Sequence, residues 1–300
     1  MRMAITGSTG MIGSTLISFF LSKGHSVTQI TRQRVLKGAH QTPFLTWDPD
    51  AGQIDSQALE GHDAVIHLAG ANVGERWSES YKKDILQSRV KGTRLLCQTL
   101  ARLKDKPKVL LSASAVGYYG NHAPDKILDE NSPQGQGFLP DVCQQWEEET
   151  KVAKDAGIRV VNMRFGVVLS KNGGALAKMW TPFQMGLGGV LGSGKQMMSW
   201  VALDEIPFII GHLMNKDISG PVNLVSPQVV SNAQFTRVLG QVIKRPTIFH
   251  IPGFMIQLLF GEMGERLLLE GARVVPKRLQ ETGYQFHYPD LRSALEQAVR

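Results

Sequence analysis

A glycine-rich loop between a short apolar strand and a helix is the feature that most limits how this chain can fold. The strand covers residues 2–6, and the helical stretch covers residues 15–21 and ends at Lys23-Gly24. The loop between them reads Gly7, Ser8, Thr9, Gly10, Met11, Ile12, Gly13. A loop of this kind that joins a strand to a helix is typical of dinucleotide-binding folds.

Each glycine of this loop has a physical task in such a fold. Gly7 permits the tight turn, Gly10 lets the backbone approach a pyrophosphate, and Gly13 allows the helix to pack closely on the strand. The helix N-terminus supplies N–H donors and a favourable dipole for phosphate. The sequence therefore predicts a bound dinucleotide rather than a glycine-rich turn without a ligand.

Strands and helices alternate along the first half of the chain, which indicates βαβ units and a parallel sheet. Further strands are predicted over residues 27–31, 63–68, 108–112 and 159–164, and helices over 79–103 and 144–155. The predicted fold class is α/β, a Rossmann doubly wound parallel sheet with a smaller, mostly helical C-terminal substrate region. We expect an NADP-binding domain over 1–170, its sheet completed by parts of 195–230. The substrate-side region would cover 171–300 and include a small domain at 250–300.

The choice of cofactor is made where the second strand ends. An NAD-preferring site usually has an Asp or Glu there for the ribose 2′-hydroxyl. No acidic residue occurs between Ser22 and Trp47, and Arg32 follows the strand, with Arg34 or Lys37 as possible helpers. Because a guanidinium suits a phosphate well, the sequence favours NADP(H) over a solvated basic loop.

Charge and cysteine content limit the partners. The 300 residues carry a formal net charge of +7, all of it in residues 151–300, where the basic side chains are spread singly. This spread argues against nucleic acid, and the apolar runs are too short for a membrane span. Two cysteines are too few for a disulfide framework, so we expect a cytoplasmic protein. It would be a monomer or homodimer with a small-molecule substrate, which the basic second half allows to be anionic.

Several stretches together resemble a known family. The N-terminal loop and His67-Leu68-Ala69-Gly70 are similar to extended short-chain dehydrogenases. The further stretches are ERWS at 75–78, SRVKGT at 88–93, SASAVGYYG at 112–120, MRFGVVL at 163–169 and the tail 251–298. With them the chain resembles an atypical extended short-chain dehydrogenase/reductase family, epimerase-like proteins that end in a small extra domain and lie in the NAD-dependent epimerase/dehydratase superfamily.

The resemblance implies a bound NADP(H) and places its contacts. It puts residues 7–13 at the phosphates and Arg32 at the 2′-phosphate. Leu68, Ala69 and Gly70 would pass the adenine ribose, and the turn of Phe165, Gly166 and Val167 would lie beside the nicotinamide. Asp48 stands where relatives often contact adenine, or else it belongs to a simple turn.

The catalytic pattern of that family is incomplete here. Ser114 matches the substrate-orienting serine, but no Tyr is followed by Lys at the fourth position, and Arg89 replaces an Asn common near the nicotinamide. Three alternatives stay open. Tyr118 or Tyr119 is the acid, with Arg89 supplying positive charge; Ser114 suffices alone; or the protein binds NADP(H) without turnover.

Other candidate residues carry weaker signals. Cys143 is a nucleophile or, more typically, buried filler, and Glu147 either points to the cleft or lies on a solvated helix face. Trp77, Trp146 and Trp200 line a pocket or belong to the core. No histidine spacing indicates a metal. The sequence thus predicts an NADP(H)-binding oxidoreductase or epimerase-like protein acting on an unknown small molecule, with a non-catalytic sensor or regulatory protein as the alternative.

Overall fold

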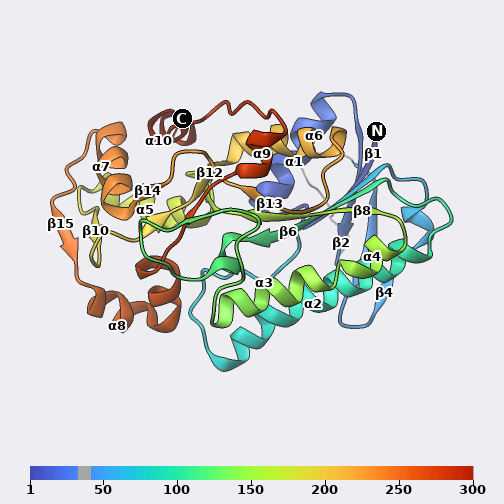
Figure 1. Cartoon of the computed structure of the whole chain (residues 1–300), viewed down its shortest axis with the longest axis horizontal. Helices are drawn as coiled ribbons and strands as arrows, with labels where there is room; N and C mark the ends of the chain where they lie inside the picture. The colour runs from blue at the N-terminus through green and yellow to red at the C-terminus, as the bar shows by residue number, and fades with distance from the viewer. Residues whose placement is uncertain (33–41, 300) are drawn as a thin grey trace.

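A parallel sheet runs through the centre of the molecule, and the computed structural model describes it within residues 1–32 and 42–299 (Figure 1). Its strands are β1 (Arg2–Thr6), β2 (Ser26–Thr31), β3 (Phe44–Asp48), β4 (Gln53–Ile54), β5 (Ala64–His67), β6 (Val109–Ala115), β8 (Arg159–Phe165) and β13 (Gly220–Leu224). Their order is β13-β8-β6-β5-β1-β2-β3-β4, parallel except for β4. The chain reverses its direction across the sheet between β1 and β5, which is the switch point of a doubly wound fold. The predicted fold class is confirmed.

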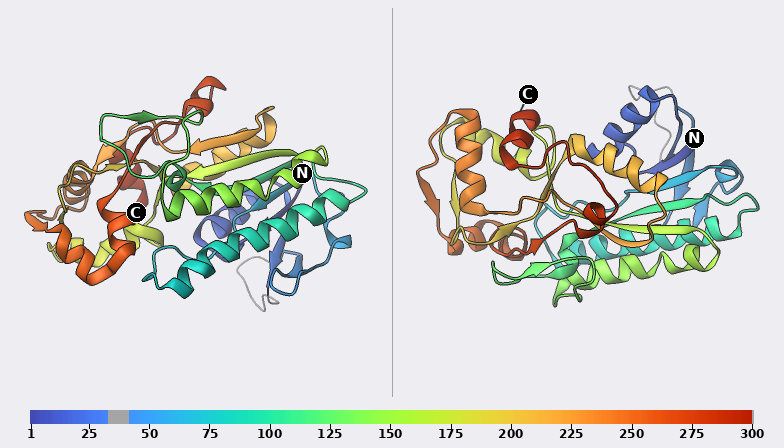
Figure 2. Two further views of the ribbon diagram at one scale, coloured as in Figure 1. Left: turned by 60° about the horizontal axis from the view of Figure 1, so that its bottom comes forward. Right: turned by 45° about the horizontal axis from the view of Figure 1, so that its top comes forward.

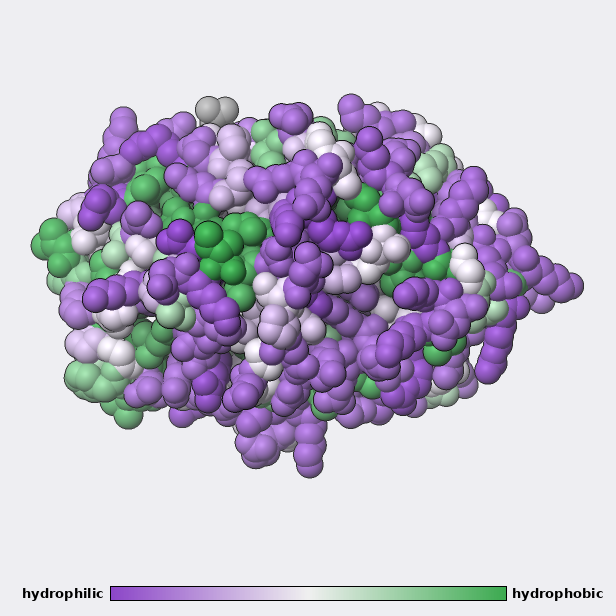
Figure 3. Space-filling model, in the orientation of Figure 1, coloured by the Kyte–Doolittle hydropathy of each residue, from purple (hydrophilic) through white to green (hydrophobic). Residues whose placement is uncertain are grey.

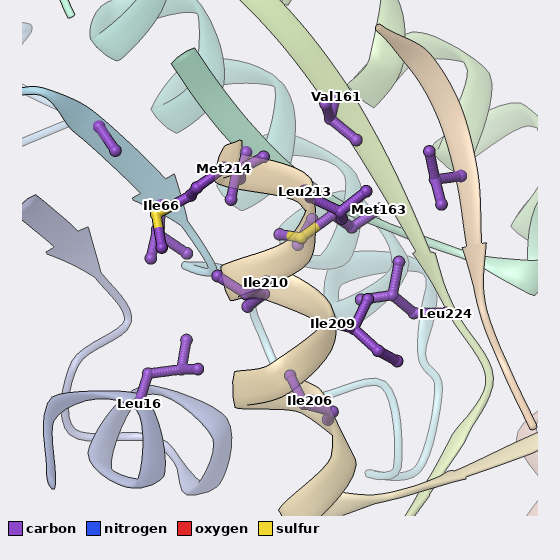
Figure 4. Packing of buried hydrophobic residues seen from close by; sticks show 14 of the residues in the cluster. Leu16, Ile66, Val161, Met163, Ile206, Ile209, Ile210, Leu213, Met214 and Leu224 are labelled. Atoms are coloured by element: carbon purple, nitrogen blue, oxygen red, sulfur yellow. The ribbon is translucent and has the colours of Figure 1, made fainter. Parts of the chain in front are cut away.

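Helices cover both faces of this sheet (Figures 1 and 2). One face carries α1 (Met11–Ser22), α6 (Ile206–Asn215) and α9 (Lys277–Glu281), and the other carries α2 (Glu79–Arg102), α3 (Phe138–Glu148) and α4 (Lys151–Asp155). Figure 4 shows Leu213 of α6 beside Met163 of β8, and Ile209 of α6 beside Leu224 of β13. Burial of each such side chain contributes roughly 1.5–3 kcal/mol to stability. Helix α6 therefore stabilises one face of the sheet, although it comes from the second half of the chain.

Two predicted helices differ from the observed ones. The first begins at Met11, inside the glycine-rich loop, because Gly13 has no side chain to keep the first turn away from the loop. The helix predicted over 144–155 is two helices, α3 and α4. They separate at Thr150, whose hydroxyl donates to the carbonyl of Glu147 at 2.6 Å, a local bond that competes with the helical ladder.

The second half of the chain adds short strands and helices at one end of the sheet. They are β9 (Val167–Leu169), α5 (Gly174–Gln184), β10 (Gly189–Leu191), β11 (Met197–Met198), β12 (Trp200–Ala202), β14 (Val230–Ser231), α7 (Asn232–Ile243), β15 (Phe249–Ile251), α8 (Gly253–Gly264), the π-helix η4 (Glu265–Leu269), β16 (Arg273–Val274) and α10 (Leu291–Ala298). The remaining elements are β7 (Ile127–Leu128) and the 3-10 turns η1 (Gln57–Leu59), η2 (Val116–Tyr119) and η3 (Leu203–Glu205). Strand β13 is at the edge of the sheet and lies within residues 195–230, the part of the chain expected to complete it. The boundaries of the predicted domains stay a prediction.

The C-terminal tail returns to the sheet domain and is fixed there. Strand β16 pairs with β7, and the hydroxyl of Ser199 donates to the carbonyl of Ala272 at 2.9 Å. Gly271 passes so close to the backbone of Met197 that a Cβ would lie 2.2 Å from its carbonyl oxygen. Among the described helices, none is long and apolar enough to cross a membrane.

Candidate functional site

The glycine-rich loop lies at the switch point, immediately after β1. Gly7 has φ = 66°, in the left-handed region that favours glycine, and its carbonyl accepts from the N–H of Gly10 at 3.0 Å. A Cβ on Gly13 would lie 2.3 Å from that same carbonyl oxygen, and one on Gly7 would lie 2.9 Å from the carbonyl carbon of Leu68. The loop therefore has the close packing that the sequence predicts for it.

The loop fits the phosphates of a dinucleotide. Helix α1 begins at Met11, and its N-cap residue Gly10 provides no side-chain cap; the first turn also holds no acid. Its first N–H groups are therefore available to an anion. The Ser8 hydroxyl is buried, and no group in the described residues pairs with it. Donors without partners at a helix N-terminus are what a pyrophosphate requires.

A buried chain of hydrogen bonds holds Leu68 and Ala69 beside this loop. The Thr6 hydroxyl accepts from the N–H groups of Leu68 and Ala69 at 2.9 and 3.2 Å. The Thr6 hydroxyl therefore donates a hydrogen bond to Nδ1 of His67 at 2.7 Å, and Nε2 of His67 donates to the Thr93 hydroxyl at 2.9 Å. Burial lowers the pKa of His67 to about 4, so the ring stays neutral.

Arg32 is exposed and follows the last residue of β2, where the sequence predicts the 2′-phosphate contact. Its predicted helpers, Arg34 and Lys37, lie outside the described residues. Asp48 accepts from the N–H groups of Asp50 and Ala51, both at 3.0 Å, so its carboxylate closes a turn. The structure thus favours the turn interpretation for Asp48.

The turn of Phe165, Gly166 and Val167 links β8 to β9 at the carboxyl edge of the sheet. A Cβ on Gly166 would lie 2.5 Å from the carbonyl oxygen of Ser199. Phe165 is buried and Val167 is half-buried. This is the edge at which open α/β sheets bind ligands.

Ser114 is joined to a buried ion pair that the sequence reading missed. Its hydroxyl donates to Oε1 of Glu147 at 2.6 Å. Arg164 donates to both carboxylate oxygens of Glu147, from Nε and Nη2, each at 2.8 Å. The Arg164 side chain is 3% exposed and the Glu147 side chain is 13% exposed. Burial lowers the pKa of Arg164, but its bonds to Glu147 and Tyr119 outweigh this and raise it.

A signal for this network is present in the sequence. Cys143 and Glu147 are four residues apart on α3, which is the Tyr-to-Lys spacing of the usual dehydrogenase pair, and they lie in the region that corresponds to it. The helical geometry places Glu147 against Ser114 at the end of β6. Glu147 points inward, and the solvated-face interpretation is wrong.

The two tyrosines have different environments. Tyr119 is fully buried, and its hydroxyl donates to Oδ1 of Asn223 at 2.8 Å and accepts from Arg164. Burial raises the pKa of Tyr119 to about 12. Tyr118 is half-buried, with the Arg164 guanidinium 3.5 Å from its ring centre. Tyr119 is engaged in packing, and an acid role for Tyr118 stays a prediction.

Arg89 is buried under the loop that follows β5. It donates to the carbonyls of Ile85 and Ala71 at 2.9 and 3.0 Å, and its guanidinium lies 4.9 Å from the ring of Trp146. Burial lowers its pKa. Within the described residues no carboxylate lies within ion-pair distance of it. Arg89 thus stabilises the loop after β5 through its bond to Ala71. Its contribution to catalysis stays a prediction.

The remaining sequence candidates are structural. Burial raises the pKa of Cys143 to about 12, so its thiol is a poor nucleophile. Trp146 and Trp200 are buried in the core, and Trp77 donates to the Val73 carbonyl at 2.9 Å. In the part of the chain that the structure describes, no cluster of His, Cys, Asp or Glu could hold a metal.

A cavity of about 200 Å³ lies between the sheet domain and the C-terminal tail. Its wall is largely apolar, with Val116, Gly117 and Val167 from the sheet side and Met197, Leu267 and Leu268 from the other. Arg266 also lines it and is paired with Glu270 on the same turn. Ser114, Tyr118 and Arg89 do not line this cavity.

Gln196 is a polar residue of this wall with a fixed side chain. Both hydrogens of its Nε2 are used, toward the carbonyls of Leu191 at 3.0 Å and Leu268 at 2.8 Å. The carboxamide orientation is therefore fixed, and its buried Oε1 has no partner in the described residues. Such an acceptor needs a donor.

Two family models match the chain. Residues 3–224 match the NAD dependent epimerase/dehydratase family, and residues 251–298 match a domain of unknown function, DUF1731. An epimerase family protein of Mycobacterium leprae is 40% identical over 298 residues, which are 99% of this chain and 95% of that protein.

Solved structures are similar over the whole chain. The crystal structure of human epimerase family protein SDR39U1 (isoform 2) with NADPH superposes with a TM-score of 0.91 at 33% identity, covering 100% of both chains. The nucleoside-diphosphate sugar epimerase of Corynebacterium glutamicum gives a TM-score of 0.79 at 34% identity, covering 99% of this chain and 58% of that one.

Proposed function

The chain belongs to the NAD dependent epimerase/dehydratase family, and on that premise we propose that it is an NADPH-dependent oxidoreductase or epimerase-like enzyme acting on a small, largely apolar molecule. The loop of residues 7–13 would hold the pyrophosphate and Arg32 the 2′-phosphate. The similar human protein crystallised with NADPH supports this choice. Bound NADPH supplies a hydride at its nicotinamide ring.

The observation that carries the catalytic proposal is the contact between Ser114 and Glu147. Because the Ser114 hydroxyl donates to Glu147 at 2.6 Å, its lone pairs are left to accept a hydrogen bond from a substrate hydroxyl. A proton can then pass from the substrate through Ser114 to Glu147, and back in the reductive direction. Arg164 holds the carboxylate in place for this exchange.

The cavity supports an uncharged substrate with an apolar body. Its volume of about 200 Å³ is below the ~300–1,000 Å³ of typical ligand pockets. Arg266 is already paired with Glu270, so it offers little to a diphosphate. These features favour a small carbonyl compound or alcohol over a nucleotide sugar, and an anionic substrate stays a prediction without support from this wall.

Binding without turnover is the second candidate function. The absence of a Tyr-x-x-x-Lys pair from the sequence favours it, and so does the position of Ser114 outside the cavity wall. A cytoplasmic location is part of either proposal, since both cysteines are free and buried.

Cofactor preference is tested by titrating the protein with NADPH and NADH. NADPH should bind more tightly, and Arg32→Asp should remove most of that preference because it replaces a phosphate-binding cation with an anion. Equal affinity of the unmodified protein for both cofactors would overturn the assignment of Arg32.

Turnover is tested by following NADPH oxidation with a panel of small apolar aldehydes and ketones. Glu147→Gln and Ser114→Ala should each lower kcat by about 100-fold or more while NADPH affinity is retained. The matched control is Gln145→Ala, an exposed neighbour on α3, which should keep full activity. Unchanged kcat in Glu147→Gln would exclude the proton path, and retained NADPH binding without turnover of any compound would favour the binding protein.

A further inference from the structure

Helix α8 presents an unusually apolar face to the surface. Outside the buried Ile256, its first half exposes large hydrophobic side chains, and Ile248 just before it is 81% exposed. We call these residues the α8 face: Ile248, Phe254, Met255, Leu258, Leu259 and Phe260. A surface helix normally turns polar side chains outward. Hydrophobic side chains are visible at the end of the molecule where α8 and β15 lie (Figures 1 and 3).

The side chains of the α8 face form adjoining rows. Phe254 with Leu258, and Met255 with Leu259, are spaced by four residues and so lie next to one another on the helix surface. Between Arg245 and Glu262 the sequence contains no Asp, Glu, Lys or Arg. The stretch that carries the α8 face is therefore free of acidic, Lys and Arg side chains.

The size of the α8 face suits a protein partner. Its six side chains are between 39% and 81% exposed, and a fully exposed one offers about 200 Å², so together they present on the order of 700 Å². The largest apolar patch of a typical monomer is about 300–600 Å², whereas a stable interface buries about 800 Å² per partner. The α8 face exceeds the first value and approaches the second.

We propose that the α8 face binds a second copy of this chain in a two-fold symmetric dimer. A two-fold contact sets the residues near its axis against their own copies, so charges there would repel one another. The uncharged stretch from 246 to 261 meets that requirement. A membrane surface is a poorer match, because helices that lie on anionic membranes carry Lys or Arg on the same helix beside their apolar side chains.

This contact also bears on the cavity. Helix α8 has a kink at Gly261, and its last residues lead into η4, whose Leu267 and Leu268 line the cavity. A second copy packed on α8 would therefore hold that wall in place from outside. The dimer does not depend on the proposed function, since it rests on the surface alone.

The test is the molar mass of the full chain, measured by light scattering after size-exclusion chromatography at micromolar concentration. We expect a dimer for the unmodified protein. Leu258→Asp should weaken the dimer by at least about 100-fold, as expected for a residue at the centre of an interface. The control Ile127→Asp replaces a hydrophobic residue of β7 that is also largely exposed, at 61%, but lies outside the α8 face. It should leave the molar mass unchanged. NADPH binding shows that each variant is folded.

Three results would overturn the proposal. The unmodified protein could be a monomer at every concentration measured, or Leu258→Asp could stay dimeric with the same dissociation constant. The third is cosedimentation of the unmodified protein with vesicles of anionic phospholipid, lost in Leu258→Asp, which would assign the α8 face to a lipid surface instead.

Discussion

Replacing His67 with Gln should remove a defined part of the pH dependence of stability. His67 is fully buried between Thr6 and Thr93, and a Gln side chain can keep one acceptor and one donor there. Burial lowers the pKa of His67 to about 4 from the ordinary value of 6.5. The folded protein thus keeps the ring neutral, while the unfolded chain takes up a proton near pH 6.5.

The sign and size of the effect follow from linkage. Between about pH 6.5 and pH 4 the unfolded state binds more protons at this position, so stability falls as the pH falls. A pKa difference of about 2.5 corresponds to about 3 kcal/mol once the pH is below 4, and to about 2 kcal/mol at pH 5. Above pH 7 the contribution of His67 titration is negligible.

Urea unfolding at about pH 7.5 and about pH 5 measures this difference. The unmodified protein should lose about 2 kcal/mol more than His67→Gln between the two pH values, because the other histidines are common to both proteins and cancel. If the free energies of unfolding of the two proteins stay parallel across this range, His67 does not titrate as its burial requires.

Three other substitutions or reactions probe separate parts of the site. Gly13→Ala should abolish NADPH binding, because its Cβ would lie 2.3 Å from the Gly7 carbonyl oxygen; calorimetric titration with an unchanged Kd would contradict this. Arg164→Met should lower the free energy of unfolding in urea by about 3–5 kcal/mol, because it leaves the carboxylate of Glu147 buried without its cation. A loss below about 1 kcal/mol would show that the pair is well solvated. Cys143, with its pKa raised to about 12, should react with a thiol reagent only after unfolding, and a rapid reaction of the native protein would refute its burial.

The sheet and the phosphate loop could be predicted because their signals are local. An apolar strand, a glycine turn and a helix adjoin one another in residues 2–22, and period and glycine spacing are enough to identify them. Helix boundaries were less accessible. The break at Thr150 depends on one side-chain bond to the Glu147 carbonyl, which no periodicity reveals.

The polar network around Ser114 could not be predicted because its members come from separate elements. Ser114 ends β6, Glu147 lies on α3 and Arg164 on β8, and only the register of β6 against β8 brings Ser114 opposite Arg164. The same holds for the cavity, whose lining residues are drawn from separate stretches between Val116 and Ala272. The spacing of Cys143 and Glu147 was the one local signal.

The return of the tail to the sheet domain sets an order of events during synthesis. Strands β1 to β6, strand β8 and the phosphate loop lie within residues 2–165, so they can pair while the rest of the chain is still on the ribosome. The wall built from Leu267 and Leu268, and the pairing of β16 with β7, must wait until the chain beyond Arg266 has been made. A nascent protein would thus have its phosphate loop before the wall of the substrate cavity exists.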